Sequence, residues 1–166
     1  MDEPGTHPAA CGQSWSFHEG ELDRDDVAAL LALHFTEMRG GSPPSACHVL
    51  DLDSLRSPTI RFFSLREERR LLGVGALRSI EPGHGEIKSM RTAADVLGRG
   101  VGSAMLAHLV ATAKEMGMAR LSLETGNSPL FDAANRLYLR DGFAVCGPFA
   151  DYRPTDFTTF YTRRLD

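Results

Sequence analysis

The chain has 166 residues, of which 42% are hydrophobic and 24% are charged, and its formal net charge at pH 7 is −4. This length suits one domain with a sizeable core and hardly allows two. A weakly acidic chain has no broad basic surface, so no nucleic acid partner is expected. No apolar run reaches the length of a transmembrane helix, so no membrane partner is expected either.

The cysteines and histidines lack the spacing of a disulfide framework or a metal site. Cys11, Cys47 and Cys146 are odd in number and widely spaced, which is typical of a reducing compartment. The six histidines form no His-x-x-x-His pair, so no metal is expected. Residues 1–13 lack the apolar segment of a signal peptide. We therefore expect a cytoplasmic protein with a flexible tail over 1–13 and a single domain over 14–166.

Hydrophobic periodicity in the first half of the chain predicts two helices and four strands. Asp23 is a suitable N-cap, and apolar residues recur after it at helical spacing until Gly40 and Gly41. Prolines then place residues 42–45 in a loop. The helices are expected over residues 23–38 and 48–55, and the strands over 14–18, 59–65, 71–80 and 86–92.

The second half predicts two helices that each end at a glycine. Apolar residues from Val101 to Ala113 lie on one helical face, and Gly117 suits a left-handed cap after it. Gly142 follows the other helix in the same way. The helices are expected over residues 101–116 and 131–140, and the strands over 121–123, 143–146 and 157–165. Strands and helices in this order predict a mixed α/β domain around one sheet.

The strongest functional signal is the segment 97–103, Leu-Gly-Arg-Gly-Val-Gly-Ser, between a predicted strand and the long helix. The first N–H groups of a helix have no intrahelical partners and attract anions. Glycines let this backbone approach a phosphate closely, and Arg99 adds a cation. A tight turn without a ligand is the alternative. The dinucleotide fingerprint and the Gly-Lys-Ser/Thr of a triphosphate loop are both absent.

Two segments beside this loop carry a family resemblance. Residues 86–92 (Glu-Ile-Lys-Ser-Met-Arg-Thr) precede the loop, and residues 137–143 read Leu-Tyr-Leu-Arg-Asp-Gly-Phe. Together with the loop they resemble the acetyl-CoA motif and the Leu-Tyr-x-x-x-Gly-Phe segment of the GNAT superfamily of N-acetyltransferases. The resemblance covers residues 14–166. It extends to a little-characterised bacterial subgroup that shares residues 86–92, 121–126 and 148–152.

The resemblance implies a GNAT fold, in which a single, mostly antiparallel sheet is splayed at the acetyl-CoA site and flanked by helices. It implies an enzyme that uses acetyl-CoA as co-substrate and acetylates a small amine by direct attack. Two alternatives stay open. One is a non-catalytic sensor module that binds acyl-CoA, and the other is a protein N-acetyltransferase. Family members commonly pair, so a homodimer is consistent with the resemblance.

The same resemblance implies which residues bind acetyl-CoA. The N–H of Met90 polarises the thioester carbonyl, and the strand around it pairs with the pantetheine arm. Leu97 stands where the family usually has Arg or Gln, so weaker phosphate binding is expected. Phe131 stands where the family often has Asn, so one polar contact to the pantetheine arm is in doubt. The implied binding residues are Met90, Arg91, Thr92, Leu97, Gly98, Arg99, Gly100, Val101, Gly102, Ser103 and Phe131.

Glu86 is the catalytic base that the resemblance implies. It lies four residues before Met90, and regular strand alternation places both on one face of the sheet. An acid at this position acts as the general base in relatives of the family. The alternative is a solvated carboxylate at a strand end, paired with Lys88 or Arg78. Glu124, at the end of the next strand, is the substitute candidate for the base.

Tyr138 is the implied general acid toward the CoA thiolate, and an aromatic residue that only packs is the alternative. The acceptor pocket has its own candidates. His34 lies on the apolar stripe of the first helix, so a buried packing histidine is the alternative there. Arg91 can hold a substrate carboxylate or pair with an acidic side chain. If it reaches the pocket, an anionic amine such as an amino acid is favoured. The acceptor candidates are His34, His48, Arg91 and Glu124.

Overall fold

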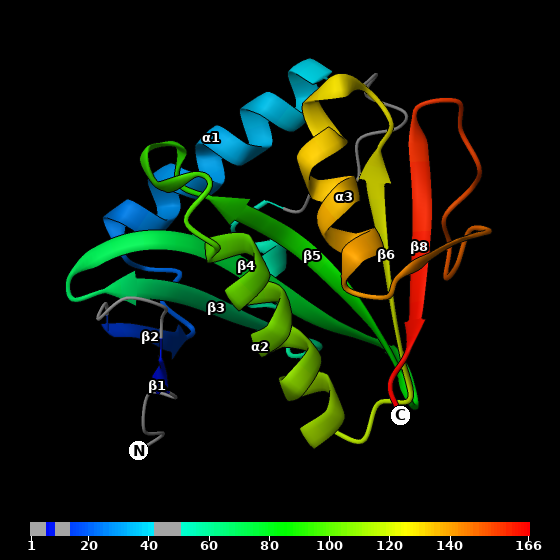
Figure 1. Ribbon diagram of the computed structural model, residues 1–166, viewed down its shortest axis with the longest axis horizontal. Helices are drawn as coiled ribbons and strands as arrows, with labels where there is room; N and C mark the ends of the chain where they lie inside the picture. The colour runs from blue at the N-terminus through cyan, green and yellow to red at the C-terminus, as the bar shows by residue number, and fades with distance from the viewer. Residues whose placement is uncertain (1–5, 9–13, 42–50) are drawn as a thin grey trace.

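The computed structural model describes residues 6–8, 14–41 and 51–166, which form one sheet with helices on both faces (Figure 1). The strand order is β1-β2-β3-β4-β5-β6-β8-β7, and in the described residues neighbouring strands are antiparallel except β5 with β6. The mixed α/β fold with a mostly antiparallel sheet is therefore confirmed. The strands are β1 (Thr6–Pro8), β2 (Ser14–Glu19), β3 (Ile60–Glu67), β4 (Arg70–Glu81), β5 (His84–Thr92), β6 (Arg120–Gly126), β7 (Ala144–Cys146) and β8 (Thr158–Arg164).

Three α-helices and three short 3₁₀ turns connect these strands in the described residues. The left-handed caps predicted after two of the helices are present, because Gly117 has φ 80° and Gly142 has φ 91°. No helix among the described residues is long and apolar enough to cross a membrane. The helices are α1 (Asp25–Gly41), α2 (Val101–Glu115) and α3 (Asp132–Arg140), and the turns are η2 (Ser54–Arg56), η3 (Ala94–Val96) and η4 (Pro129–Phe131).

Three expectations differ from the structure. Thr6–Pro8 pair with Ser14–Ser16, so the flexible tail predicted over 1–13 contains a strand. Three residues are too few to show alternation, and a proline fits a strand only at an edge. The helix predicted to end near residue 38 runs through Gly41, because a glycine in the last turn costs only about 1 kcal/mol. Of the helix predicted over 48–55, residues 48–50 lie outside the described residues, and the rest contains only η2.

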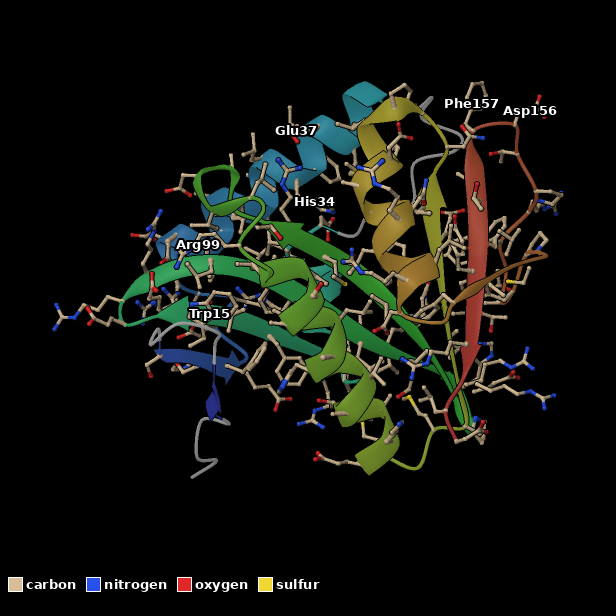
Figure 2. The ribbon with its side chains drawn as sticks, viewed as in Figure 1. Trp15, His34, Glu37, Arg99, Asp156 and Phe157 are labelled. Carbon is tan, nitrogen blue, oxygen red and sulfur yellow. The ribbon has the colours of Figure 1, made fainter. Side chains whose placement is uncertain are left out.

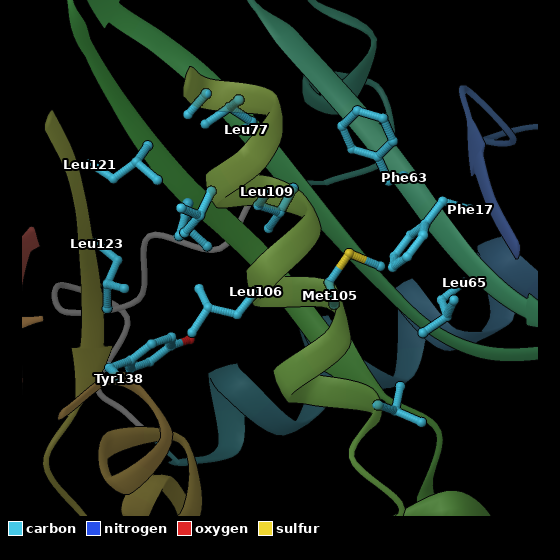
Figure 3. Packing of buried hydrophobic residues seen from close by; sticks show 14 of the residues in the cluster. Phe17, Phe63, Leu65, Leu77, Met105, Leu106, Leu109, Leu121, Leu123 and Tyr138 are labelled. Atoms are coloured by element: carbon cyan, nitrogen blue, oxygen red, sulfur yellow. The ribbon is translucent and has the colours of Figure 1, made fainter. Parts of the chain in front are cut away.

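The core has two parts, one on each face of the sheet. Residues of α2 such as Met105, Leu106 and Leu109 pack against β3–β6 on one face, where Figure 3 shows them beside Leu121 and Leu123. A side chain at position 75 of β4 would place its Cβ 2.8 Å from Met105, so Gly75 allows α2 to pack closely against the sheet. Hydrophobic residues of α1 cover the opposite face of β3 and β4. They are Val27, Leu30 and Leu31, against Phe62, Val74 and Ala76.

The sheet opens between β5 and β6. These strands pair only over His84–Glu86, at one end, and then diverge (Figure 1). Beyond that point β5 also carries a bulge, because Val74 pairs with Arg91 while Ala76 pairs with Lys88. Ser89, inside the bulge, has φ 54°. The parting of the strands and the bulge together create the splayed sheet that the family resemblance implies.

Arg66 of β3 ties the start of α1 to the sheet. Its buried guanidinium donates to Glu21 at 2.8 Å and to Asp26 at 2.7 Å, and the Ser64 hydroxyl also donates to Glu21, at 2.5 Å. Burial opposes ionisation of Glu21, but the hydrogen bonds from Ser64 and Arg66 outweigh it and lower its pKa. The hydrogen bond from Arg66 is the main cause that lowers the pKa of Asp26. This cluster fixes how α1 lies over the sheet.

Candidate active site

A cleft of about 700 Å³ lies where β5 and β6 part. Its walls come from strands β5 and β6, from the start of α2, and from helices α1 and α3. Residues 86–92 of β5 line one side, and residues 124–126 of β6 line the other. The glycine segment and the first turn of α2 close one end together with α3, and α1 contributes His34, Glu37 and Met38.

The glycine segment has the backbone conformation that an anion site needs. Gly98 has φ 81° and Gly100, the N-cap of α2, has φ 85°, a region that disfavours other residues. A Cβ on Gly102 would lie 3.3 Å from Leu137, so this glycine lets α2 and α3 approach. The first turn of α2, whose N–H groups have no partners within the helix, therefore lines the cleft. Leu97 is 69% exposed at the rim.

Arg99 does not lie where the sequence analysis placed it. Its guanidinium pairs with Glu67 at 3.1 Å and lies over the ring of Trp15, so it points toward β3 (Figure 2). Arg99 is also absent from the cleft wall, whereas Arg140 of α3 lines it, with Nη2 3.4 Å from the Ser103 hydroxyl. Arg140 is therefore the cation beside the glycine segment. The only feature of the sequence that pointed to Arg140 was its place two residues after Tyr138 in the predicted helix.

The bulge in β5 changes which side chains share a face. Ile87 and Met90 both pack against the α2 side of the sheet, although they are three residues apart. The extra residue of the bulge shifts the alternation by one. Glu86 and Met90 therefore lie on opposite faces, and the prediction that they share one is wrong. Met90 and Arg91 do lie on opposite faces, as predicted, since Arg91 contacts α1.

Glu86 is buried on the α1 face, with only 1% of its side chain exposed. It accepts a hydrogen bond from the Tyr152 hydroxyl at 2.5 Å, and Lys88 and Arg78 each donate to it at 3.4 Å. The pairing with Lys88 and Arg78 is the alternative considered from the sequence, except that the carboxylate is buried rather than solvated. Glu124 lies on the same face, because it follows Ser122, the register partner of Glu86, by two residues.

Tyr138 extends from α3 toward α2, and Figure 3 shows its hydroxyl end near Leu106. The side chain lines the cleft and packs edge-on against Phe143, with ring centroids 6.0 Å apart. Burial raises the pKa of Tyr138 to about 12. The phenol thus keeps its proton at neutral pH, as a general acid must. It is also a packing residue, so the two interpretations of Tyr138 are compatible.

Phe131 closes the β6 side of the cleft. Its ring lies so close to Gly126 that a Cβ there would be 2.1 Å from it. Glycine at 126 is therefore required to seat the ring. The position thus contributes an apolar wall to the cleft, where the family often has an amide side chain.

The α1 side of the cleft carries a charged pair and a histidine, of which Figure 2 labels Glu37 and His34. Arg91 forms an ion pair with Glu37. His34 is buried next to them, and its Nδ1 has no hydrogen-bond partner among the described residues. Burial, with help from the nearby Arg91 charge, lowers the pKa of His34 to about 4, so the ring is neutral at pH 7. His48, the remaining acceptor candidate, lies outside the described residues.

A family model described as the acetyltransferase (GNAT) family matches residues 25–143. The chain belongs to this family. It is 46% identical over 145 residues to YedL, an uncharacterized N-acetyltransferase of Escherichia coli strain K12, with 87% of this chain and 91% of that one covered. A Klebsiella pneumoniae structure provisionally described as an acyl-CoA N-acyltransferase is 27% identical. Its TM-score is 0.77, over 92% of this chain and 98% of that one.

A GNAT acetyltransferase from Elizabethkingia anophelis, solved with acetyl-CoA bound, shares the fold. Its TM-score is 0.68 at 18% identity, over 91% of this chain and 98% of that one. Membership of the GNAT family makes this chain an acetyl-CoA-dependent acyltransferase with acetyl-CoA as its co-substrate. The cleft between β5 and β6, which reaches the first turn of α2, is consistent with this. No group of acidic, His and Cys side chains in the described residues is arranged to hold a metal.

Sequence reasoning missed two residues that contact the candidate residues Glu86 and Arg91, besides Arg140. Tyr152 contacts Glu86 across 66 residues of sequence, and Glu37 reaches Arg91 from α1. The only sequence signal for Tyr152 was the Pro-Phe-Ala-Asp-Tyr segment shared with a bacterial subgroup. Glu37 gave no signal, because an acid on an exposed helix face is ordinary.

Proposed function

We propose that this GNAT enzyme transfers the acetyl group of acetyl-CoA to the amine of a small molecule that also carries a carboxylate, such as an amino acid. The observation that carries the proposal is the composition of the α1 side of the cleft. Arg91 there is the kind of side chain that binds carboxylates in two-point contacts. The neutral His34 ring beside it offers a further polar contact in a buried setting.

The proposed reaction is direct attack of the amine on the thioester. Positioning and proton transfer suffice, because the thioester is already activated. The N–H of Met90, in the bulge, donates to the carbonyl oxygen as its charge develops. Glu86 takes the proton that the amine loses, and Tyr138 gives a proton to the departing thiolate. One N–C bond forms and one C–S bond breaks, and the two proton transfers balance.

Glu86 is the proposed base because it lies at the point where β5 and β6 part. Glu124 is the second candidate, since it lines the same cleft from β6. The proposed cofactor-binding set keeps Met90, Thr92 and the glycine segment and replaces Arg99 with Arg140. Phe131 is proposed to contact the pantetheine arm through its apolar ring alone.

The Arg91–Glu37 pair gives the proposal its selectivity. Glu37 already neutralises Arg91 through their ion pair, so an uncharged amine gains nothing from the arginine. A substrate carboxylate replaces Glu37 as the partner of Arg91 and accepts two aligned hydrogen bonds from its guanidinium. The site therefore favours an acceptor that brings a negative charge over one of the same size without it.

The substitution Arg91→Met tests this selectivity. We expect kcat/KM for a carboxylate-bearing acceptor to fall by about 10- to 100-fold, since a charge-assisted hydrogen bond contributes about 1.5–3 kcal/mol. The matched amide of the same acceptor should be unaffected. The measurement is release of the CoA thiol with each acceptor of the pair. Arg56→Met, which removes an exposed arginine paired with Asp23, is the control. Unchanged acceptor preference in Arg91→Met would contradict the role of Arg91.

A further inference from the structure

Lysine is rare in this chain, and one of its lysines lies in the cleft. Of the 18 basic residues, 16 are arginines and only Lys88 and Lys114 are lysines. Lys114 is exposed near the end of α2. Lys88 lines the cleft on the α1 face, and only 8% of its side chain is exposed. Arginine stays protonated in proteins, whereas a lysine can release and take up a proton.

Lys88 begins a continuous chain of short hydrogen bonds. Its Nζ donates to the Tyr152 hydroxyl at 2.6 Å, and that hydroxyl donates to Oε2 of Glu86 at 2.5 Å. The direct distance from Nζ to Oε2 is longer, at 3.4 Å. Tyr152 is thus the bridge between the two charged groups. Its ring is held by Phe149 and Phe160, with centroids 5.1 and 5.9 Å away.

Glu86 has little room to meet a substrate by itself. Arg78 from β4 faces Oε1, and Tyr152 from the segment between β7 and β8 faces Oε2. Glu124 of β6 adds its charge to the field at Lys88 and Tyr152. On the remaining side, the register partner Ser122 is hydrogen-bonded to His84 rather than to Glu86. Lys88 is the more exposed of the two ends of the chain, and burial lowers its pKa.

We propose that Lys88 is a catalytic residue, which takes the proton of the acceptor amine and passes charge through Tyr152 to Glu86. The inference rests on the proposed function, because it specifies how Glu86 acts as the base. Lys88 first gives a proton to the Tyr152 oxygen while Tyr152 gives its own proton to Glu86. The neutral amine of Lys88 then takes one proton from the attacking acceptor. The chain gains one proton in all, and it is released to solvent after turnover.

The two substitutions Lys88→Arg and Lys88→Met distinguish a role of Lys88 in proton transfer from a role of its positive charge alone. Arginine keeps the positive charge and the hydrogen-bond donors but does not lose its proton. We expect both variants to lower kcat by about 100-fold or more, the size of a lost general base, with unchanged affinity for acetyl-CoA. Tyr152→Phe should lower kcat by about 10-fold or more, since it removes the bridge. Lys114→Arg, at the other lysine, is the matched control and should behave like the wild type.

A measurement without any acceptor tests the same inference. In protein labelled with ¹³C-lysine only two side chains give Cε signals, and Lys88→Arg assigns them. We expect the Lys88 signal to titrate below the ordinary lysine pKa of about 10.4, and at still lower pH in Glu86→Gln, where the anion is lost. A Lys88 signal that titrates at or above this ordinary value would overturn the inference.

The outcomes also separate this inference from the proposed function. Wild-type kcat in Lys88→Arg, with Glu86→Gln inactive, overturns the role of Lys88 and leaves the proposed function standing. Wild-type kcat in Glu86→Gln overturns the base assignment itself. If no small amine is acetylated, the proposed function fails, and the lysine titration still decides whether Lys88 has the proton affinity that the inference requires.

Discussion

The substitution Tyr138→Phe is expected to lower kcat by about 100- to 10,000-fold, the range for loss of a general acid. It removes one oxygen and keeps the ring, which packs against Phe143 and Tyr161. The fold should therefore survive, and acetyl-CoA affinity should change little. Burial raises the pKa of Tyr138 to about 12, so the phenol is protonated at every pH used in ordinary assays. Accordingly, kcat should show no loss from this group below about pH 11.

Tyr161→Phe is the control for this prediction. It removes the hydroxyl of a neighbouring tyrosine whose ring lies 6.0 Å from that of Tyr138, on a residue that does not line the cleft. We expect kcat of this variant to stay within about twofold of the wild type, as for a buried change that leaves the reacting atoms alone. Near wild-type kcat in Tyr138→Phe would mean that Tyr138 only packs.

The substitution Arg66→Met is expected to lower the free energy of unfolding by about 3 kcal/mol at pH 7. Removing one partner of a buried ion pair leaves the other charges uncompensated, at a cost of about 3–5 kcal/mol. We take the lower end because the Asp26 side chain is 41% exposed and partly screened. For a domain of this size, Tm should fall by about 6–12 °C. Arg61→Met, which breaks the exposed pair with Glu19, should cost less than about 1 kcal/mol.

The effect of Arg66→Met should depend on pH. The pKa values of Glu21 and Asp26 are lowered in the fold. The stability that these carboxylates contribute is therefore present above their unfolded pKa values of about 4, and it is lost as pH falls through the lower folded values. Thermal melts at pH 7 and pH 3 should show the gap between wild type and variant shrink at acid pH. A gap of equal size at both pH values would contradict the ionic origin of the stabilisation.

Most of the fold could be predicted from the sequence because its signals are local. The apolar face from Val101 to Ala113 specifies α2, and Gly117 and Gly142 end their helices in the left-handed conformation. The glycine segment could be placed at the start of α2 for the same reason. Its need for positive φ at Gly98 and Gly100 follows from residue type and position alone.

The candidate site was harder to predict, because its geometry depends on a bulge and on distant contacts. Nothing in residues 86–92 signals that Ser89 adopts φ 54°, and the bulge moves Met90 to the face opposite Glu86. Arg99 was placed at the phosphates because of its neighbours in sequence. In the fold Glu67, from β3, takes its guanidinium instead. Tyr152 contacts Glu86 because the segment before β8 folds back over the sheet. Hydrophobic periodicity predicts local structure and does not predict contacts between distant segments.

The most direct test of the account is an acceptor screen with the wild-type protein. Acetyl-CoA is supplied with free amino acids, the amide of each amino acid, and short peptides, and the products are identified by mass spectrometry. We expect an N-acetylated product from at least one amino acid and a much weaker signal from its amide, because Arg91 and His34 line the α1 side of the cleft, where we propose that the acceptor binds. Acetylation of peptides or proteins alone, or equal rates with the acid and the amide, would contradict the account.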